Sequence, residues 1–373
     1  MSTRGVKITL LAVTLILCLL GLFFVFEASG VESYQLSADT YYQLKKQAAG
    51  LGIGLLALLI ASRFPNKFLI KLAWPLYIIA LTVTIFAFIP GFSNELLGAK
   101  RWVAIGPISF QTVEVVKLCS VVFFAWLFSR KTNWQTMIIF TIPLAVLILL
   151  QRDLGSLLVL GTAVFAMYFI AGAKLKDIGI IAGGALVLIL IMILAVPFRR
   201  ERLLAYLHWS SDTEAAASVD TWHVDQLLLG LGRGGIFGQG IGNSRQKFSF
   251  VPEPSTDSIF AIVGEEIGFF GCALILMLYI FFLYLIFRLV KNAPLSQAQS
   301  LLGYGILALF AAQIFLNIAA ISSLTPLTGI TLPFFSYGSS SLTISLSLVG
   351  VVLGLNDDGR PVVKKRRARI IKR

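Results

Sequence analysis

Charged residues are scarce in this sequence, and their scarcity excludes a soluble protein. Asp, Glu, Lys and Arg make up 13% of the 373 residues, whereas hydrophobic residues make up 57% and the mean hydropathy is +0.87. A soluble chain needs far more polar surface. Cysteine is scarce too, and Cys18, Cys119 and Cys272 all fall inside apolar runs without paired metal-ligand spacing. We therefore expect reduced packing residues and neither a disulfide framework nor a cysteine metal site.

Apolar runs recur along the chain, and about 20 residues suffice to cross a hydrocarbon core of about 30 Å. They predict an all-α polytopic membrane protein with about ten transmembrane helices. The predicted spans are Ile8–Phe26, Ala48–Ala61, Phe68–Ile89, Val113–Phe128, Trp134–Leu150, Leu154–Ala171, Ile178–Pro197, Ile259–Phe287, Leu301–Ile321 and Leu342–Leu355. The first run is too long for the core of a signal peptide, so we expect it to be retained as a helix.

Basic residues alternate between the connections, and this alternation predicts the orientation of the chain. The basic connections carry Arg63 and Lys67, Arg130 and Lys131, Lys174 and Lys176, and Arg288 and Lys291. The positive-inside rule then places both termini in the cytoplasm and the long connection 198–256 outside. The net charge is +13, and many basic residues follow the last span, which favours an anionic lipid surface over nucleic acid. We predict a membrane domain over 1–359 and a basic cytoplasmic tail over 360–373.

Several charged residues occur where the membrane makes them costly. The predicted outer side carries the cations Lys100, Arg101, Arg152, Arg199, Arg200 and Arg202, which call for an anionic substrate or for neutralisation by phospholipid or local carboxylates. Glu114 and Lys117 stand three residues apart in an apolar run, so they share one helical face and can neutralise each other. This pair serves either structure or substrate binding.

Two acidic neighbours and two glycine-rich stretches complete the polar features. Glu265 and Glu266 point about 100° apart on a helix, so we expect at most one to face a given cavity and the other to cap or contact the outer connection. The glycines of 230–242 could cradle phosphate or sugar groups, or the stretch could simply fold back on the membrane surface. Gly, Ser and Pro over 326–341 predict broken backbone that lines a cavity.

Four ordered segments resemble motifs of the SEDS family (shape, elongation, division and sporulation). They are GAKRWVAIGPISFQTVEVVKL (Gly98–Leu118), QRDLGSLLVL (Gln151–Leu160), GRGGIFGQGIGNSRQKFSFVPEPSTDSIFAIVGEEIGFFG (Gly232–Gly271) and PLTGITLPFFSYGSSSL (Pro326–Leu342). Residues 242–247 resemble the division and sporulation branch more than the elongation branch. The sequence departs from the pattern at Thr112 and Val113 (usually Pro-Ser), Arg152 (Pro), Ser258 (Phe) and Ser339 (Gly).

The resemblance implies the SEDS fold and a peptidoglycan glycosyltransferase. Such an enzyme polymerises lipid II, an undecaprenyl-pyrophosphate-linked disaccharide peptide, into β-1,4 glycan strands at the outer face of the cytoplasmic (inner) membrane. It also implies a role in septal wall synthesis at the division septum, with a class B penicillin-binding protein and divisome proteins as partners. Asp257 is then the catalytic base, or a ligand of Mg²⁺ or Mn²⁺, and no organic cofactor is needed. From the residues alone, Asp257 could instead be the N-cap of the following helix.

The residues expected to bind substrate combine these charges with the family motifs. They are Arg101, Lys100, Glu114, Lys117, Asp153, Lys247, Glu253, Glu266, Ser336 and Ser340. We expect Asp153 to support the site by pairing with Arg101 or Arg152. Three alternatives stay open: a lipid II flippase, a non-catalytic scaffold that recruits division proteins, and a role in elongation or sporulation.

Overall fold

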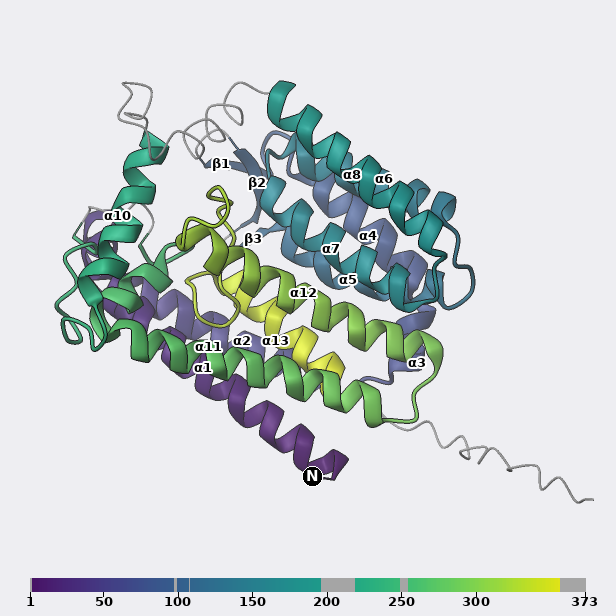
Figure 1. Cartoon of the computed structure of the whole chain (residues 1–373), viewed down its shortest axis with the longest axis horizontal. Helices are drawn as coiled ribbons and strands as arrows, with labels where there is room; N and C mark the ends of the chain where they lie inside the picture. Colours follow the sequence, from purple (N-terminus) through teal and green to yellow (C-terminus); the bar gives the residue numbers. More distant parts are fainter. Residues whose placement is uncertain (1, 97–98, 107, 196–218, 249–253, 356–373) are drawn as a thin grey trace, which may run out of the picture.

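The computed structural model describes residues 2–96, 99–106, 108–195, 219–248 and 254–355, and most of them are helical (Figure 1). The helices are α1 (Thr3–Ser37), α2 (Tyr42–Arg63), α3 (Asn66–Lys71), α4 (Ala73–Phe86), α5 (Thr112–Phe128), α6 (Trp134–Leu150), α7 (Leu154–Ile170), α8 (Leu175–Ala195), α10 (Val219–Gly234), α11 (Ile259–Asn292), α12 (Gln297–Ile321) and α13 (Ser339–Leu353). Each predicted span coincides with one helix, except that the third covers both α3 and α4.

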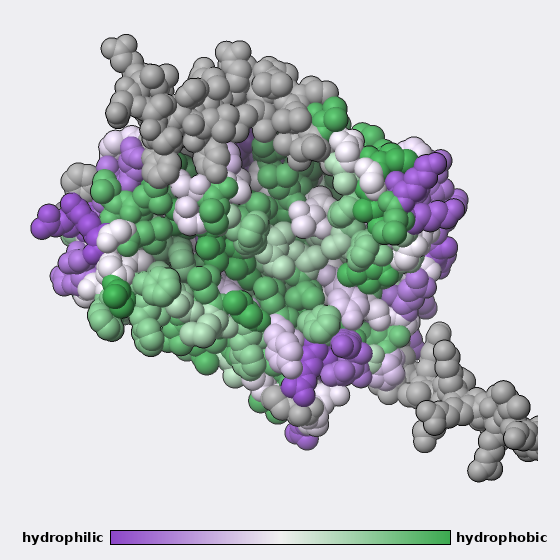
Figure 2. Space-filling view, viewed as in Figure 1, coloured by the Kyte–Doolittle hydropathy of each residue, from purple (hydrophilic) through white to green (hydrophobic). Residues whose placement is uncertain are grey.

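The helices form a bundle whose surface suits a bilayer. Among the described residues, α1, α2, α11 and α12 are long and apolar enough to cross a membrane, and α4, α6, α7 and α13 are shorter apolar helices. Figure 2 shows hydrophobic side chains over the middle of the viewed face and hydrophilic ones toward its two ends. Large apolar side chains such as Leu19 and Ile280 are 61% and 66% exposed. Exposed apolar surface on this scale fits lipid, and the protein is a polytopic membrane protein.

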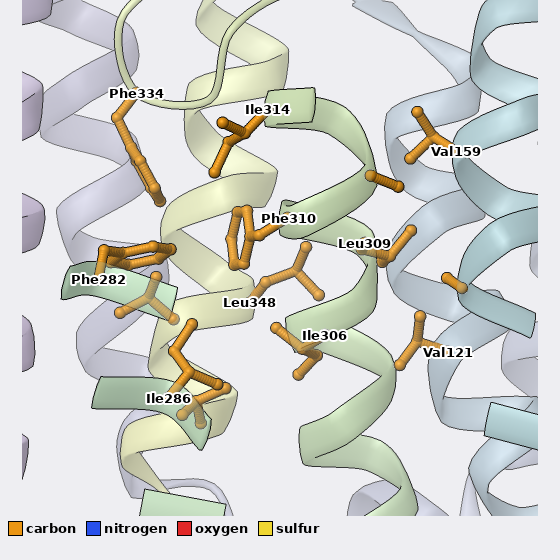
Figure 3. Close-up of a cluster of buried hydrophobic side chains, with 14 of the residues drawn as sticks. Val121, Val159, Phe282, Ile286, Ile306, Leu309, Phe310, Ile314, Phe334 and Leu348 are labelled. Carbon is orange, nitrogen blue, oxygen red and sulfur yellow. The ribbon is translucent and has the colours of Figure 1, made fainter. Parts of the chain in front are cut away.

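Close helix pairs build the core. Helix α1 packs on α11, α2 on α13, α4 on α5, and α7 on α12. Gly350 of α13 lets the backbones approach, because a Cβ there would lie 2.5 Å from the carbonyl oxygen of Leu58 in α2. Figure 3 shows Phe282, Phe310 and Phe334 meeting in the centre, with ring centroids 5.2 to 5.5 Å apart. These rings join α11, α12 and the segment that follows α12.

A small antiparallel sheet, which the all-α prediction missed, leads into α5. Its strands β1 (Ser93–Leu96), β2 (Ala99–Ile105) and β3 (Ile108–Gln111) lie in that order, with Trp102 opposite both Asn94 and Gln111. Strands this short carry little alternating pattern, and their pairing is a tertiary property. The helical fold class is otherwise confirmed.

The predicted long outer connection contains helix α10, so residues 230–234 are helical rather than a glycine-rich loop. After α10 the chain turns back onto α11 at its kink. Gly268 has φ 68° and ψ −170°, which interrupts the helical hydrogen bonds. The amides of Phe269 and Phe270 instead donate to the carbonyls of Gly235 and Ile236, at 2.9 and 3.0 Å. The chain after α10 thus completes the broken turn of α11.

Residues 322–338, here called the inserted segment, return into the bundle between α12 and α13 without forming a helix. The hydroxyl of Tyr279 donates to the carbonyl of Pro333 at 2.6 Å, and Phe334 has φ 66°. The predicted broken backbone is therefore confirmed. The segment and the sheet lie toward the end of the bundle that carries α10 (Figure 1). At the opposite end, the Lys7 ammonium donates to the carbonyl of Leu355 at 2.9 Å, which joins the start of α1 to the end of α13.

Candidate functional site

Asp257 lies just before α11 and is partly buried. The N-cap of α11 is Ser258, so Asp257 is not the capping residue. The hydroxyls of Thr256 and Ser258 donate to Oδ1 of Asp257 at 3.4 and 3.3 Å. The side-chain amide of Asn317 in α12 donates to the backbone carbonyl of Asp257 at 3.0 Å. Backbone and carboxylate are thus both held in a fixed orientation.

The carboxylate borders a small cavity, with room for about one water molecule, between α10, α12 and the inserted segment. Its lining residues are Leu227, Asp257, Ser258, Asn317, Ala320, Ile321, Leu327, Thr328, Gly329 and Ile330. Gly329 has φ 66°, and a Cβ added there would lie 3.8 Å from Oδ2 of Asp257. Oδ1 therefore receives the two hydroxyls, whereas Oδ2 lies on the Gly329 side of the cavity.

Two further polar atoms of the cavity residues lack a hydrogen-bond partner among the described residues. They are Oδ1 of Asn317 and Oγ1 of Thr328, both buried. An unpaired buried oxygen is costly unless a ligand or water satisfies it. The cavity thus combines one carboxylate with a carboxamide oxygen and a hydroxyl, a set suited to a polar ligand or a hard cation.

Glu114 and Lys117 form the predicted ion pair inside the bundle. The ammonium of Lys117 lies 2.8 Å from Oε1 of Glu114, and their side chains are only 7% and 4% exposed. Lys117 also donates to Oε1 of Gln313 at 3.0 Å, and the Gln313 amide donates to the carbonyl of Thr331 at 2.9 Å. The pair is therefore tied through α12 to the inserted segment, next to the cavity wall at Ile330.

Glu265 and Glu266 both bind the chain that follows α10, which confirms the expected contact with the outer connection. Glu265 accepts hydrogen bonds from the Ser244 hydroxyl and from the amides of Arg245 and Gln246. Glu266 accepts from the ammonium of Lys247 at 3.0 Å. Oε2 of Glu266 is buried and has no hydrogen-bond partner among the described residues. The contacts that do form arise because the turns after α10 fold onto the start of α11, which no local sequence pattern reveals.

Lys247 has a second carboxylate partner. Its ammonium lies 3.3 Å from Oε2 of Glu27 in α1, and the lysine side chain is 9% exposed. Lys247 therefore joins α1 to α11 through the turns after α10. These contacts give Lys247 and Glu266 a structural task, and their predicted role in substrate binding stays a prediction.

The predicted pairing of Asp153 with an arginine is wrong. Asp153 is the N-cap of α7 and accepts from the amide of Ser156 at 3.0 Å. Arg101 of β2 donates instead to the backbone carbonyls of Gln151 and Arg152. A capping carboxylate is already satisfied by helix amides, so the guanidinium takes the adjacent carbonyls. Lys100 precedes Arg101 on β2, at the end of the bundle that carries the inserted segment (Figure 1).

The two predicted serines support the backbone around the inserted segment. The Ser336 hydroxyl accepts from the amide of Leu332 at 2.8 Å, and the Ser340 hydroxyl accepts from the amide of Gln111 at 3.5 Å. Tyr337 donates its amide to the carbonyl of Ser255 at 2.8 Å. Burial, with Tyr42 and Glu32 acting in the same direction, raises the pKa of the Tyr337 phenol to about 12. Glu253, Arg199, Arg200 and Arg202 lie outside the described residues.

Sequence reasoning overlooked four polar residues that the structure brings to this end of the bundle. They are Gln313, Asn317, Thr328 and His223. Gln313 and Asn317 carried a usable signal, because both interrupt the apolar run 301–321, where polar side chains are costly. Thr328 lies within the quoted motif Pro326–Leu342, and His223 is one of only two histidines in the sequence, but neither position by itself indicates a place beside Asp257.

Comparisons with known proteins agree with this arrangement. The family model of FtsW, RodA and SpoVE, described as cell cycle protein, matches residues 8–360. The chain is 34% identical to the probable peptidoglycan glycosyltransferase FtsW of Saccharophagus degradans, over 95% of this chain and 93% of the relative. It is also 34% identical to the stage V sporulation protein E of Bacillus subtilis, over 93% of this chain and 96% of the relative.

Solved structures share the fold. One, entitled structural coordination of polymerization and crosslinking by a peptidoglycan synthase complex, matches with a TM-score of 0.74 and 28% identity, over 93% of this chain and 96% of the other. The crystal structure of the rod shape determining protein RodA of Thermus thermophilus gives a TM-score of 0.67 and 26% identity, over 92% and 94% of the two chains. Sequence, family motifs and fold agree over nearly the whole chain, which therefore belongs to the SEDS family of FtsW, RodA and SpoVE.

Proposed function

We propose that this chain is a peptidoglycan glycosyltransferase that polymerises lipid II into β-1,4 glycan strands. The observation that carries the proposal is Asp257, a partly buried carboxylate held at a small cavity at one end of a lipid-facing bundle. A lipid-linked sugar would present its reacting groups at such an end. The relatives named as probable peptidoglycan glycosyltransferases support the same reaction.

The reaction needs one base. Oδ2 of Asp257 accepts the proton of the acceptor sugar hydroxyl, and the hydroxyl oxygen attacks the anomeric carbon of the donor sugar. The bond from that carbon to the pyrophosphate oxygen breaks, and undecaprenyl pyrophosphate leaves with the bonding electrons. An α-linked donor gives a β-linked product, so this is direct displacement with inversion and without a covalent sugar intermediate. The thermodynamic activation already resides in the pyrophosphate.

Fixed cations stabilise the leaving pyrophosphate in this proposal. Arg101 and Lys100 lie on β2, and Lys117 is held by Glu114 inside the bundle. Positive charge held in place before the reaction stabilises negative charge as it develops, without reorganisation. Lys117 acts on the cavity through Gln313 and the inserted segment, so Glu114 and Lys117 shape the site as well as its charge.

A divalent cation fits the oxygen atoms beside Asp257. Mg²⁺ prefers oxygen ligands and is commonly held by one or two carboxylates together with substrate phosphates. Asp257, Asn317 and Thr328 offer a carboxylate, a carboxamide oxygen and a hydroxyl at one cavity. Among the described residues, no group of three or more His, Cys, Asp or Glu side chains could hold a metal ion. Substrate phosphates would therefore have to complete the coordination. When bound, Mg²⁺ or Mn²⁺ would neutralise pyrophosphate charge.

The predicted topology and the relatives support a proposal for the cellular role. We place both termini in the cytoplasm, which agrees with the contact between Lys7 and Leu355 at the end of the bundle opposite the cavity. The FtsW relatives and the residues 242–247 favour septal wall synthesis over elongation. A class B penicillin-binding protein is the proposed partner, because a structural match comes from a peptidoglycan synthase complex.

Purified protein in liposomes, given lipid II on one side, tests the proposal. We expect glycan chains from the wild type, and loss of a general base lowers the rate in Asp257→Asn by about 10² to 10⁴-fold. Translocation of lipid II without polymer would favour the flippase. Normal septation in cells whose only copy is Asp257→Asn would favour the scaffold. Either outcome would overturn the glycosyltransferase.

A further inference from the structure

Ser258 occupies the N-cap position of α11, but its hydroxyl does not cap the helix. An N-cap serine usually accepts a hydrogen bond from an amide of the first helical turn. Here the hydroxyl lies 3.3 Å from Oδ1 of Asp257 and 3.1 Å from Nε2 of His223. The serine is 1% exposed. A side chain that gives up its capping bond for these two partners is held by the site rather than by the helix.

The number of protons fixes the direction of the two hydrogen bonds. A serine hydroxyl has one proton and can also accept, whereas a carboxylate only accepts. Ser258 therefore donates to Asp257, and Nε2 of His223 must carry a proton and donate to Ser258. The order is His223 to Ser258 to Asp257, which links α10 to the start of α11.

We propose that His223 and Ser258 are positioning residues that set the orientation of the Asp257 carboxylate. By directing the hydroxyl proton of Ser258 to Oδ1, to which the Thr256 hydroxyl also donates, His223 keeps Oδ2 on the Gly329 side of the cavity, where the proposed reaction needs the acceptor hydroxyl. Hydrogen bonds to a charged group are stronger than neutral ones, and small errors in the position of a base slow proton transfer.

This arrangement belongs to the present sequence rather than to the family pattern, which has Phe in place of Ser258. Phenylalanine has no hydroxyl, so it cannot receive a hydrogen bond from His223 or donate one to Asp257. Helix α10 packs against α11, which keeps the histidine in place. The inference rests on the proposed glycosyltransferase function, because it describes how the base of that reaction is oriented.

The test measures turnover and half-saturating lipid II concentration separately in purified protein. Loss of a hydrogen bond to a charged group predicts about tenfold lower turnover in Ser258→Ala and in His223→Phe, with half-saturation unchanged. The double variant should be no slower than Ser258→Ala, since both changes break one chain of hydrogen bonds. Ser258→Thr keeps the hydroxyl and His223→Gln keeps an N–H donor, so both should stay close to the wild-type rate.

Controls separate the positioning role of His223 from nonspecific effects of substitution in α10 and from failure of the proposed function. Leu229→Ala, at an exposed position of α10, should change neither constant. Full turnover in His223→Phe, multiplied losses in the double variant, or no rescue by the two conservative variants would overturn the positioning role while leaving the glycosyltransferase intact. A wild type that makes no glycan would instead overturn the function itself and this inference with it.

Discussion

Asp257 immediately precedes α11 and Glu266 lies within it, but their carboxylates have different surroundings. Glu266 is 1% exposed, and its partner is the ammonium of Lys247 at 3.0 Å. Asp257 is partly buried, receives two hydroxyls on one oxygen and borders a cavity with the other. An acidic side chain paired with a buried cation is suited to holding structure. One whose oxygen faces a cavity can exchange a proton with a substrate.

Lys117 and Lys247 are both buried and paired with carboxylates. Of the substitutions at these pairs, Lys117→Met should have the largest effect. It leaves Glu114 in the bundle without its cation, which costs about 3 to 5 kcal/mol for a broken buried pair. We expect a lower midpoint of thermal unfolding in detergent and no glycan synthesis. The double variant Glu114→Gln/Lys117→Met removes both charges and should recover stability but not activity. Normal polymerisation by Lys117→Met would show that the ion pair is not required for glycan synthesis.

Lys247→Met should destabilise the protein by less, about 3 kcal/mol, because one of the two carboxylate partners of Lys247, Glu27, is 19% exposed and can be hydrated when the lysine is lost. Its loss releases the turns after α10 from both α1 and α11. Activity per folded molecule should persist, which thermal unfolding and polymerisation measured on the same sample will show. If Lys247→Met instead melts like the wild type but makes no glycan, Lys247 binds substrate as the sequence suggested.

Gly329→Ala tests the cavity side of the comparison. A left-handed backbone costs about 1 to 2 kcal/mol for a residue with a Cβ, so the inserted segment should shift beside Oδ2 of Asp257. We expect about tenfold slower polymerisation, as that energy converts at 1.36 kcal/mol per tenfold. Gly172→Ala is the matched control, since Gly172 also has a positive φ, 92°, and a Cβ there meets no atom within 4 Å. Equal rates for the two variants would separate Gly329 from the reaction.

Lys45→Met should have the smallest effect. Lys45 lies 2.7 Å from Asp39 in an exposed pair, and exposed pairs contribute little. The hydrogen bond from Lys45, with that from the Tyr41 amide, lowers the pKa of Asp39. The contribution of this pair is therefore present at neutral pH and lost as the pH falls through the lowered pKa. The variant should melt like the wild type at neutral pH, and a large drop would contradict the ranking.

The sequence predicted most of the helices and little of the contacts between them. Span positions follow from hydropathy, which is a local property, and the spacing of Glu114 and Lys117 places both on one helical face. The hydrogen-bond and ion-pair partners of Glu265 and Glu266 depend instead on how the turns after α10 fold back. Such contacts join residues far apart in the chain, and hydrophobic periodicity contains no information about them.

The candidate site divides in the same way. Asp257 was predicted because its motif resembles that of a family, and its position before α11 agrees with the predicted helix boundary. Its neighbours His223 and Asn317 come from other helices, and Asp153 caps α7 although an arginine stands next to it in sequence. The sequence identifies polar residues that are candidates for the site, whereas the tertiary structure determines which of them are in contact.

Asp257→Asn and Glu266→Gln, prepared side by side, test the central claim most directly, with thermal unfolding and lipid II polymerisation measured on each. The amide of Asn keeps the size of the carboxyl group but cannot accept the proton. We predict that Asp257→Asn melts like the wild type and polymerises about 10² to 10⁴-fold more slowly. Glu266→Gln should melt earlier and stay active where folded. Wild-type polymerisation by Asp257→Asn would contradict the assignment of the base.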